Sequence, residues 1–190
     1  MKKEGKKSTG LGLIIYMEWI FPIIDYYQSL RKSEKIFEVV LPTIIALICT
    51  TVYLDNGKLF WALKGFSNIM PTAISILIGF TVMLITLLLT SGGENIKILK
   101  ETKTNGVLRN ESISLYQGLH IQFSHSLFSE AFLLLLIFFY MFLYGIGIPI
   151  WAEFAFMVIE IYLTLNILFS ILRGITNLYF SFFKQKSASG

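Results

Sequence analysis

Four long apolar stretches constrain the fold of this chain more than any other feature of its sequence. They cover roughly residues 36–54, 66–90, 127–145 and 148–172. A helix needs about 20 predominantly apolar residues to cross the hydrocarbon core of a bilayer. Only 15% of the 190 residues are charged, whereas soluble domains contain about 25%. The sequence therefore predicts a polytopic membrane protein.

The spanning segments are predicted to be helices. Only helices and closed barrels satisfy the backbone hydrogen bonds inside lipid, and a barrel strand alternates apolar and polar residues over about ten positions. The second stretch contains ILIGFTVMLITLLLT, which does not alternate. We expect an all-α protein with four transmembrane helices, arranged as two hairpins (36–90 and 127–172) that are joined by a connection (91–126).

Residues 1–35 are predicted to form a basic N-terminus followed by a helix that lies in the membrane interface. Residues 11–30 are largely apolar but carry Glu18 and Asp25, and Pro22 would interrupt a spanning helix. A tryptophan and several tyrosines in this stretch suit the headgroup level. A fifth span is the less favoured alternative. A cleaved signal peptide is disfavoured because no small-residue cleavage site is present.

Lysine and arginine residues predict the orientation. Two of the sixteen, Lys58 and Lys64, lie between the first two apolar stretches, and the other fourteen lie at the termini or in the 91–126 connection. Short cytoplasmic connections carry an excess of Lys and Arg. We therefore expect both termini, including the tail 173–190, and the 91–126 connection to be cytoplasmic.

The 91–126 connection is expected to form a short helical hairpin. Asn105–Gly106 is a strong turn signal, and apolar residues recur at helical spacing from Leu115 to Leu127. The connection is too small for a catalytic domain, but its basic residues are candidates for contact with a partner or with lipid. These residues are Lys97, Lys100, Lys103 and Arg109.

No signature of catalysis, cofactor binding or metal binding is present in the sequence. It lacks a Gly-rich phosphate loop, a paired-cysteine metal site and a nucleophile elbow. His120 and His125 are five residues apart, so on a helix they would face different directions and share no metal. The sequence thus predicts a protein that is not an enzyme and needs no cofactor. Ser75 and Gly79 form a small-xxx-small pair, which favours close helix packing within or between subunits.

A polar stripe on the last predicted span is the candidate functional site. Glu153 and Glu160 are seven residues apart, so they share a helix face with Thr164 nearby, and Asn166 lies about 60° round the helix. Glu160 lies midway along the apolar stretch 148–172, where an acidic residue costs about 2.5–3.5 kcal/mol on insertion scales. No lysine or arginine lies within any predicted span to pair with it.

Three arrangements reduce the cost of Glu160: a protonated carboxyl with a hydrogen-bond partner, a polar contact between helices, or a water-filled cavity. The contact between helices is the ordinary outcome. In a symmetric oligomer the stripe could instead line an axis as acidic rings, which favour cations. Because four spans offer few polar partners, we expect a homo-oligomer, with a tetramer favoured.

The order of these parts resembles a known family of small membrane proteins. A basic N-terminus and a hairpin of two spans lead through IGFTVMLITLLLTSGGENIKILKET, residues 78–102, into a short cytoplasmic link and a second hairpin. This arrangement is similar to the membrane subunit of the Kiwa anti-phage defence system, KwaA. The resemblance spans most of the chain. It implies a homotetrameric sensor of phage infection in the bacterial inner membrane, with a cytoplasmic DNA-binding partner, KwaB, and it assigns no role to individual residues.

Two functions are expected, and a membrane-embedded enzyme is a weak third because catalytic clusters are missing. The first is a non-enzymatic sensor or scaffold that contacts membrane lipids, self-assembles and recruits a cytoplasmic protein, without binding nucleic acid itself. The second is an ion-conducting or membrane-permeabilising effector whose pore is lined by Glu153 and Glu160.

Overall fold

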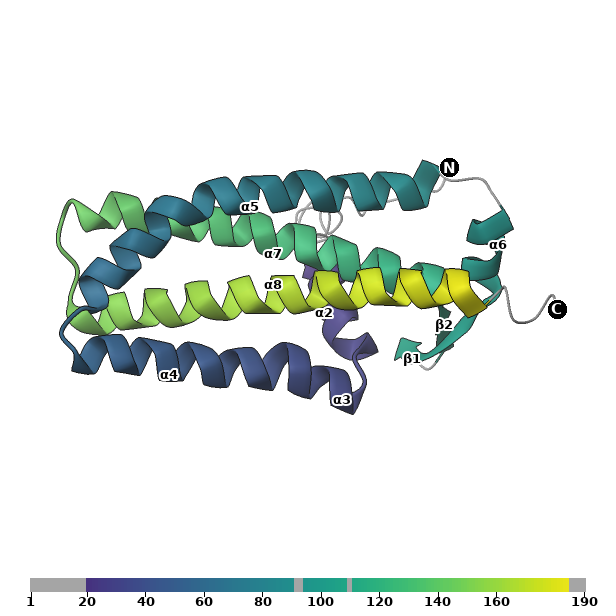
Figure 1. Cartoon of the computed structure of the whole chain (residues 1–190), viewed down its shortest axis with the longest axis horizontal. Helices are drawn as coiled ribbons and strands as arrows, with labels where there is room; N and C mark the ends of the chain where they lie inside the picture. The colour runs from purple at the N-terminus through teal and green to yellow at the C-terminus, as the bar shows by residue number, and fades with distance from the viewer. Residues whose placement is uncertain (1–19, 91–93, 109–110, 185–190) are drawn as a thin grey trace, which may run out of the picture.

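The protein is a bundle of long helices with a small β-hairpin at one end (Figure 1). The structure is a computed structural model that describes residues 20–90, 94–108 and 111–184. Within these ranges, four segments are long and apolar enough to cross a membrane. They are Lys32–Asp55, Leu59–Thr90, Leu115–Tyr144 and Ile150–Phe180. The prediction of an all-α protein with four candidate transmembrane helices is confirmed, whereas the compartment that each end faces stays a prediction.

The first spanning segment is built from three consecutive helical elements. They are α3 (Lys32–Lys35), the π-helical turn η2 (Ile36–Val40) and α4 (Leu41–Asp55). The other segments belong to α5 (Leu59–Thr90), α7 (Leu115–Tyr144) and α8 (Ile150–Lys184). α5 packs along α7, α7 packs along α8, and α4 packs along the opposite side of α8 (Figure 1). α8 is therefore the central element that joins the two predicted hairpins.

Apolar side chains form the core of the bundle and also cover its outer surface. The central core cluster consists of Ile74, Leu133, Ile137, Ile167 and Ile171. Large apolar side chains also point outward, and Phe142 and Trp151 are each 72% exposed. Apolar groups on both sides of the helices are expected when lipid, not water, surrounds the bundle.

The connections at one end of the bundle are very short. Residues 56–58 join α4 to α5, and residues 145–149 join α7 to α8. Gly57 and Gly147 adopt positive φ values of 63° and 79° in these turns, a conformation that costs glycine little. At the other end lie the start of the first segment, the end of α8 and the connection from α5 to α7 (Figure 1).

The connection from α5 to α7 differs from the predicted helical hairpin. After α6 (Glu94–Glu101), strands β1 (Lys103–Leu108) and β2 (Glu111–Ser114) pair in antiparallel fashion. The Thr104 hydroxyl also donates to the Ile113 carbonyl oxygen, at 2.9 Å. Six residues of β1 include two β-branched side chains and the Asn–Gly pair, a composition that favours strand and turn over helix. The helical hairpin was therefore a wrong prediction for residues 103–114, and the Asn105–Gly106 turn signal falls inside β1. The helical spacing from Leu115 is confirmed as the start of α7.

The helices also extend beyond the predicted spans. α7 begins at Leu115, where the Ser114 hydroxyl accepts a hydrogen bond from the Gln117 backbone N–H and caps the helix. α8 continues to Lys184, so the first residues of the predicted tail belong to the last helix. This extension places Arg173 on the helix that lies at the centre of the bundle.

Residues 21–29 form a separate short helix, α2 (Phe21–Ser29), which packs against α7. Pro22 lies in its first turn, where the missing N–H costs nothing, so the proline begins a helix and does not interrupt one. Nine residues cannot cross a bilayer. Tyr26 is 1% exposed, which means that α2 is held by the protein itself. Residues 1–19, including residues 11–19 of the predicted interfacial stretch, lie outside the described residues.

Candidate functional site

Buried charged side chains gather where η2 passes α8. The carboxylate of Glu38 is 3% exposed, and its Oε1 lies 2.5 Å from Nε of Arg173. Nη1 of the same guanidinium lies 3.1 Å from Oε2 of Glu34 on α3. We name Tyr26, Arg31, Glu34, Glu38 and Arg173 the charge cluster. Burial of a carboxylate at this depth is favourable only with a nearby cation and with hydrogen bonds. Arg173 supplies the cation, and the Tyr26 hydroxyl supplies a hydrogen bond.

Tyr26 connects α2 to the charge cluster. Its hydroxyl donates a hydrogen bond to Oε2 of Glu38, and its ring stacks on His125 of α7 with centroids 3.6 Å apart. Burial and the neighbouring Glu38 carboxylate raise the pKa of Tyr26 well above its usual value. The phenol therefore stays protonated and remains a donor at neutral pH.

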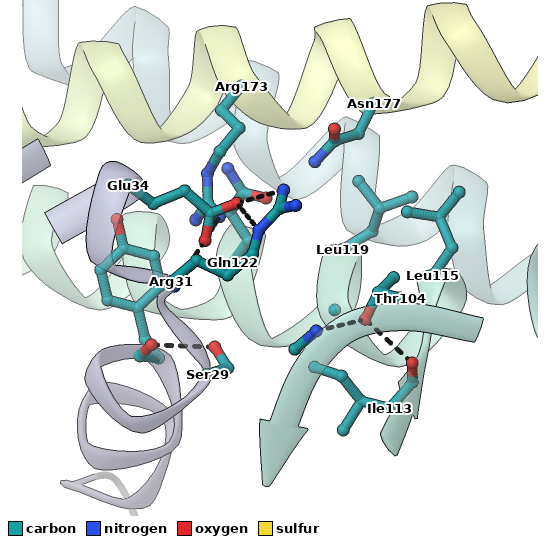
Figure 2. Close-up of a pocket in the computed structure, with 13 residues that line it drawn as sticks. Ser29, Arg31, Glu34, Thr104, Ile113, Leu115, Leu119, Gln122, Arg173 and Asn177 are labelled. Carbon is teal, nitrogen blue, oxygen red and sulfur yellow. Dashed lines mark hydrogen bonds and ion pairs between the residues drawn. The ribbon is translucent and has the colours of Figure 1, made fainter. Parts of the chain in front are cut away.

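Arg31 closes the exposed side of the charge cluster. Its backbone N–H and its Nε both donate to the Glu34 carboxylate, each at 2.8 Å, and Nη2 lies 2.6 Å from Oε1. Arg31 and Arg173 thus converge on one carboxylate from opposite sides (Figure 2). Because the Arg31 side chain is 51% exposed, this outer pair is worth little to stability compared with the buried pair.

Polar side chains extend the charge cluster along α8. The Asn166 amide donates to the backbone carbonyl of Glu38 at 2.6 Å. One turn further, the Gln122 amide of α7 donates to the Ser170 carbonyl, and the Ser126 hydroxyl donates to the Ser170 hydroxyl at 3.2 Å. These contacts fix η2, α7 and α8 relative to one another at one end of the bundle.

A small cavity of about 80 Å³ lies beside the charge cluster, between α2, the β-hairpin, α7 and α8. Figure 2 shows Arg31, Glu34 and Arg173 on one side and Thr104 of β1 on the other. Asn177 and Gln122 supply amide groups to its wall. The cavity can hold a few waters or a small polar group, and it is too small for most metabolites.

Two further carboxyl groups are buried deeper in the bundle, each against a hydroxyl of α5. The Ser67 hydroxyl donates to Oε2 of Glu160 at 3.2 Å, and the Thr81 hydroxyl donates to Oε1 of Glu130 at 2.8 Å. Both glutamates are 0% exposed. Ser67 and Thr81 are fourteen residues apart on α5, which separates the two pairs by about 21 Å along the helix. They are therefore independent contacts between helices.

The residues of the predicted polar stripe contact different parts of the bundle. Glu160 faces α5, Thr164 donates its hydroxyl to the Glu160 backbone carbonyl at 2.7 Å, and Asn166 faces η2. Glu153 is half-buried near the start of α8. The structure thus gives Glu160 a hydrogen-bond partner on another helix of the same chain, which is the ordinary outcome among the three arrangements considered above.

The small-residue pair lies on the outside of the bundle. Ser75 is exposed and its hydroxyl donates to the Pro71 carbonyl of its own helix. A Cβ added at Gly79 would meet nothing within 4 Å. These two residues therefore do not mediate helix packing inside one chain, whereas packing between copies stays a prediction.

The basic residues of the connection lie apart from the charge cluster. Lys97, Lys100 and Lys103 are exposed, and the Lys100 ammonium lies 5.1 Å from the centroid of the Tyr116 ring. Lys100 and Lys103 border the same shallow depression beside the N-terminus of α7. Arg109 lies outside the described residues.

The charge cluster itself was missed in the sequence. Glu38 lies in the first predicted span, 36–54, with no predicted partner, and Arg173 is the first residue of the predicted tail, 173–190. The available signal was one acidic residue in the apolar N-terminal part of the first span and one arginine in an apolar context at the end of the last span. Opposite charges at such positions are expected to pair, but the sequence does not indicate that these two helices are neighbours.

Among residues 20–90, 94–108 and 111–184, no group of three or more His, Cys, Asp or Glu side chains is placed to hold a metal ion. No family model, no curated protein and no solved structure matches the chain.

Replacing Glu160 distinguishes a structural carboxyl from one that lines a pore. Glu160→Gln keeps an acceptor for the Ser67 hydroxyl, so we expect unchanged assembly and unchanged ion flux in proteoliposomes. Glu160→Leu removes the acceptor and is expected to cost about 1 kcal/mol or less, the size of a polar contact between membrane helices. The measurements are detergent unfolding and liposome flux, with Glu130→Gln as the matched buried control. Loss of cation flux in Glu160→Gln with an intact assembly would instead establish the effector function.

Proposed function

We propose that this protein is a non-enzymatic sensor or scaffold that self-assembles in the bacterial inner membrane and recruits a cytoplasmic protein in anti-phage defence. The observation that carries the proposal is the asymmetry of the bundle. Two folded elements outside the spanning segments, α6 and the β-hairpin, lie at one end, and α2 packs beside them against β1 and α7 (Figure 1). Connections of three and five residues lie at the other end. A protein partner therefore has a structured surface to bind at one end of the bundle.

The charge cluster supplies a physical link between that surface and the membrane helices. It joins α2 through Tyr26, the start of the first span through Glu38 and the last span through Arg173. Displacement of either span would separate the buried charges of Glu38 and Arg173, and displacement of α2 would remove the hydroxyl that donates to Glu38. Both changes are costly, so the three elements are coupled. A change in the membrane segments would reach α2 and the adjacent β-hairpin by this route.

Sequence features support the compartment and the context. Fourteen of the sixteen basic residues belong to the sequence segments before the first span, between the second and third spans, and after the last span, and this bias favours a cytoplasmic location of those segments. The resemblance to the Kiwa membrane subunit supports a role in defence, a tetrameric assembly and a cytoplasmic partner like KwaB.

Self-assembly draws its support from the surface of α5. Ser75 and Gly79 leave open space on an exposed helix face, and small residues on such faces let helices of neighbouring copies approach closely. Glu160 no longer supports self-assembly, because Ser67 of the same chain is its partner.

The ion-conducting alternative is the weaker candidate. Glu160 would have to leave Ser67 to line a water-filled axis, and the buried carboxyl of Glu130 belongs to a separate contact about 21 Å away along α5. A relay through one bundle would need groups within hydrogen-bond reach of one another.

The docking surface is tested by reversing the charge of Lys97, Lys100 and Lys103 together. If the partner docks on the connection, the triple glutamate variant is expected to lose protection in phage plating assays and to lose crosslinking to the product of the neighbouring gene. Amounts of the protein in the membrane are expected to be unchanged, because all three side chains are exposed.

Lys58→Glu is the control, since Lys58 is an exposed lysine at the opposite end of the bundle. Full protection by the triple variant would place the docking surface elsewhere. Full protection by cells that lack the whole chain would refute the defence function itself.

A further inference from the structure

A polar cavity and a largely apolar groove both border the charge cluster. One is the polar cavity of about 80 Å³ described above. The other is an open groove of about 460 Å³ between η2 and α8. Glu34 and Arg173 line both of them. The Glu34–Arg173 ion pair thus separates the polar cavity from the apolar groove.

The groove is suited to a hydrocarbon chain. Its apolar walls are Phe37 of η2 and Phe169 and Leu172 of α8. Phe37 is 66% exposed and Leu172 is 57% exposed, so the groove opens away from the core towards the space that lipid occupies. A π-helical turn forms one wall, and such turns are frequent at functional sites.

The polar end of the groove is suited to an anion. Arg31 and Arg173 converge on the Glu34 carboxylate. Guanidinium groups bind the oxygens of a phosphate with the same paired geometry as those of a carboxylate. Lys32 and Lys35 are exposed on the same short helix as Glu34. The local charge is positive by two, because four basic residues lie beside two acidic ones. The basic residues are Arg31, Lys32, Lys35 and Arg173, and the acidic residues are Glu34 and Glu38.

We propose that this groove is a binding site for an anionic phospholipid of the surrounding leaflet. The headgroup phosphate takes the place of the Glu34 carboxylate between Arg31 and Arg173, and one acyl chain lies against Phe37, Phe169 and Leu172. Arg173 keeps Glu38 as a partner during the exchange, because separate nitrogens hold the two carboxylates. Glu34 belongs to a four-residue helix and can turn towards solvent beside Arg31. The site does not depend on the proposed sensor function.

The experiment measures which lipids the purified protein retains. The protein in mild detergent is mixed with equal amounts of phosphatidylglycerol and phosphatidylcholine, passed through size exclusion, and its lipid content is determined by mass spectrometry. The wild type is expected to retain phosphatidylglycerol in preference to phosphatidylcholine. Arg31→Gln is expected to lower that preference about fivefold, the effect of one cation near an anionic headgroup. Glu34→Gln is expected to raise it, since the competing carboxylate is removed.

Matched variants separate the site from general surface effects. Lys97→Gln and Glu101→Gln change the same charges on exposed residues of α6 and are expected to leave the preference unchanged. Phe37→Ala is expected to lower retention of phosphatidylglycerol, whereas Phe142→Ala, which truncates an equally lipid-facing ring on α7, is not.

Three results would overturn the proposal. They are equal retention of the two lipids by the wild type, equal losses in Arg31→Gln and Lys97→Gln, and displacement of the lipid by glycerophosphoglycerol at equal concentration. The last result would mean that the headgroup binds alone and that the groove holds no acyl chain.

Discussion

Arg173→Met is expected to lower the free energy of unfolding by about 3 kcal/mol, the lower end of the range for breaking a buried ion pair. The variant leaves Glu38, whose side chain is 3% exposed, with a tyrosine hydroxyl and no cation. The lower end of the range applies because the Arg173 side chain is itself 22% exposed. Unfolding in mixed micelles with increasing fractions of SDS gives the measurement.

Two comparison variants make the Arg173 result specific. Arg31→Met removes the more exposed arginine of the charge cluster and is expected to cost less than about 1 kcal/mol. The double variant Arg173→Met/Glu38→Gln removes both buried charges and is expected to recover most of the loss, because an uncompensated carboxylate is the source of the cost. Equal costs for Arg31→Met and Arg173→Met would show that the buried pair contributes no more than a surface pair.

Gly174→Ala is expected to destabilise the bundle by about 1–3 kcal/mol through overpacking. A Cβ at this position would lie 2.5 Å from Cε1 and 2.8 Å from Cζ of Phe123. Phe123 is 0% exposed and packs among Leu88, Leu99 and Leu119, so its ring has no free space to move into. The same unfolding measurement applies, and Gly174→Ala/Phe123→Leu is expected to restore part of the stability.

Gly79→Ala is the matched control for this prediction. It lies inside a spanning helix like Gly174, but its Cβ would meet nothing within 4 Å. Alanine is a better helix former than glycine by about 1 kcal/mol, so Gly79→Ala is expected to be neutral or stabilising in a monomeric detergent complex. A loss in Gly79→Ala as large as that in Gly174→Ala would argue against the close approach of α7 and α8 as the cause.

Much of the fold could be predicted from local pattern. Uninterrupted apolar runs require helices in lipid because no water is present to bond the backbone, and this single constraint set the fold class and approximately located each span. Segment boundaries were less accurate at the end of the bundle that carries the β-hairpin, where α7 begins at residue 115 and α8 ends at residue 184. There, mixed polar and apolar residues such as those from Leu115 to Leu127 continue a helix beyond the apolar run, and apolarity alone does not indicate where it begins.

The sequence by itself determined that Glu160 does not face acyl chains, since an acidic group in hydrocarbon is costly wherever it lies. Only the tertiary structure decided that this partner is Ser67 of the same chain and that Glu38 pairs with Arg173, 135 positions later. The reason is physical: a lone chain of helices can pack in several orders, and lipid-facing surfaces differ little in hydrophobicity from buried ones. No local sequence pattern therefore predicts that α4 packs against α8. For the same reason, no local pattern predicts the charge cluster that this packing creates.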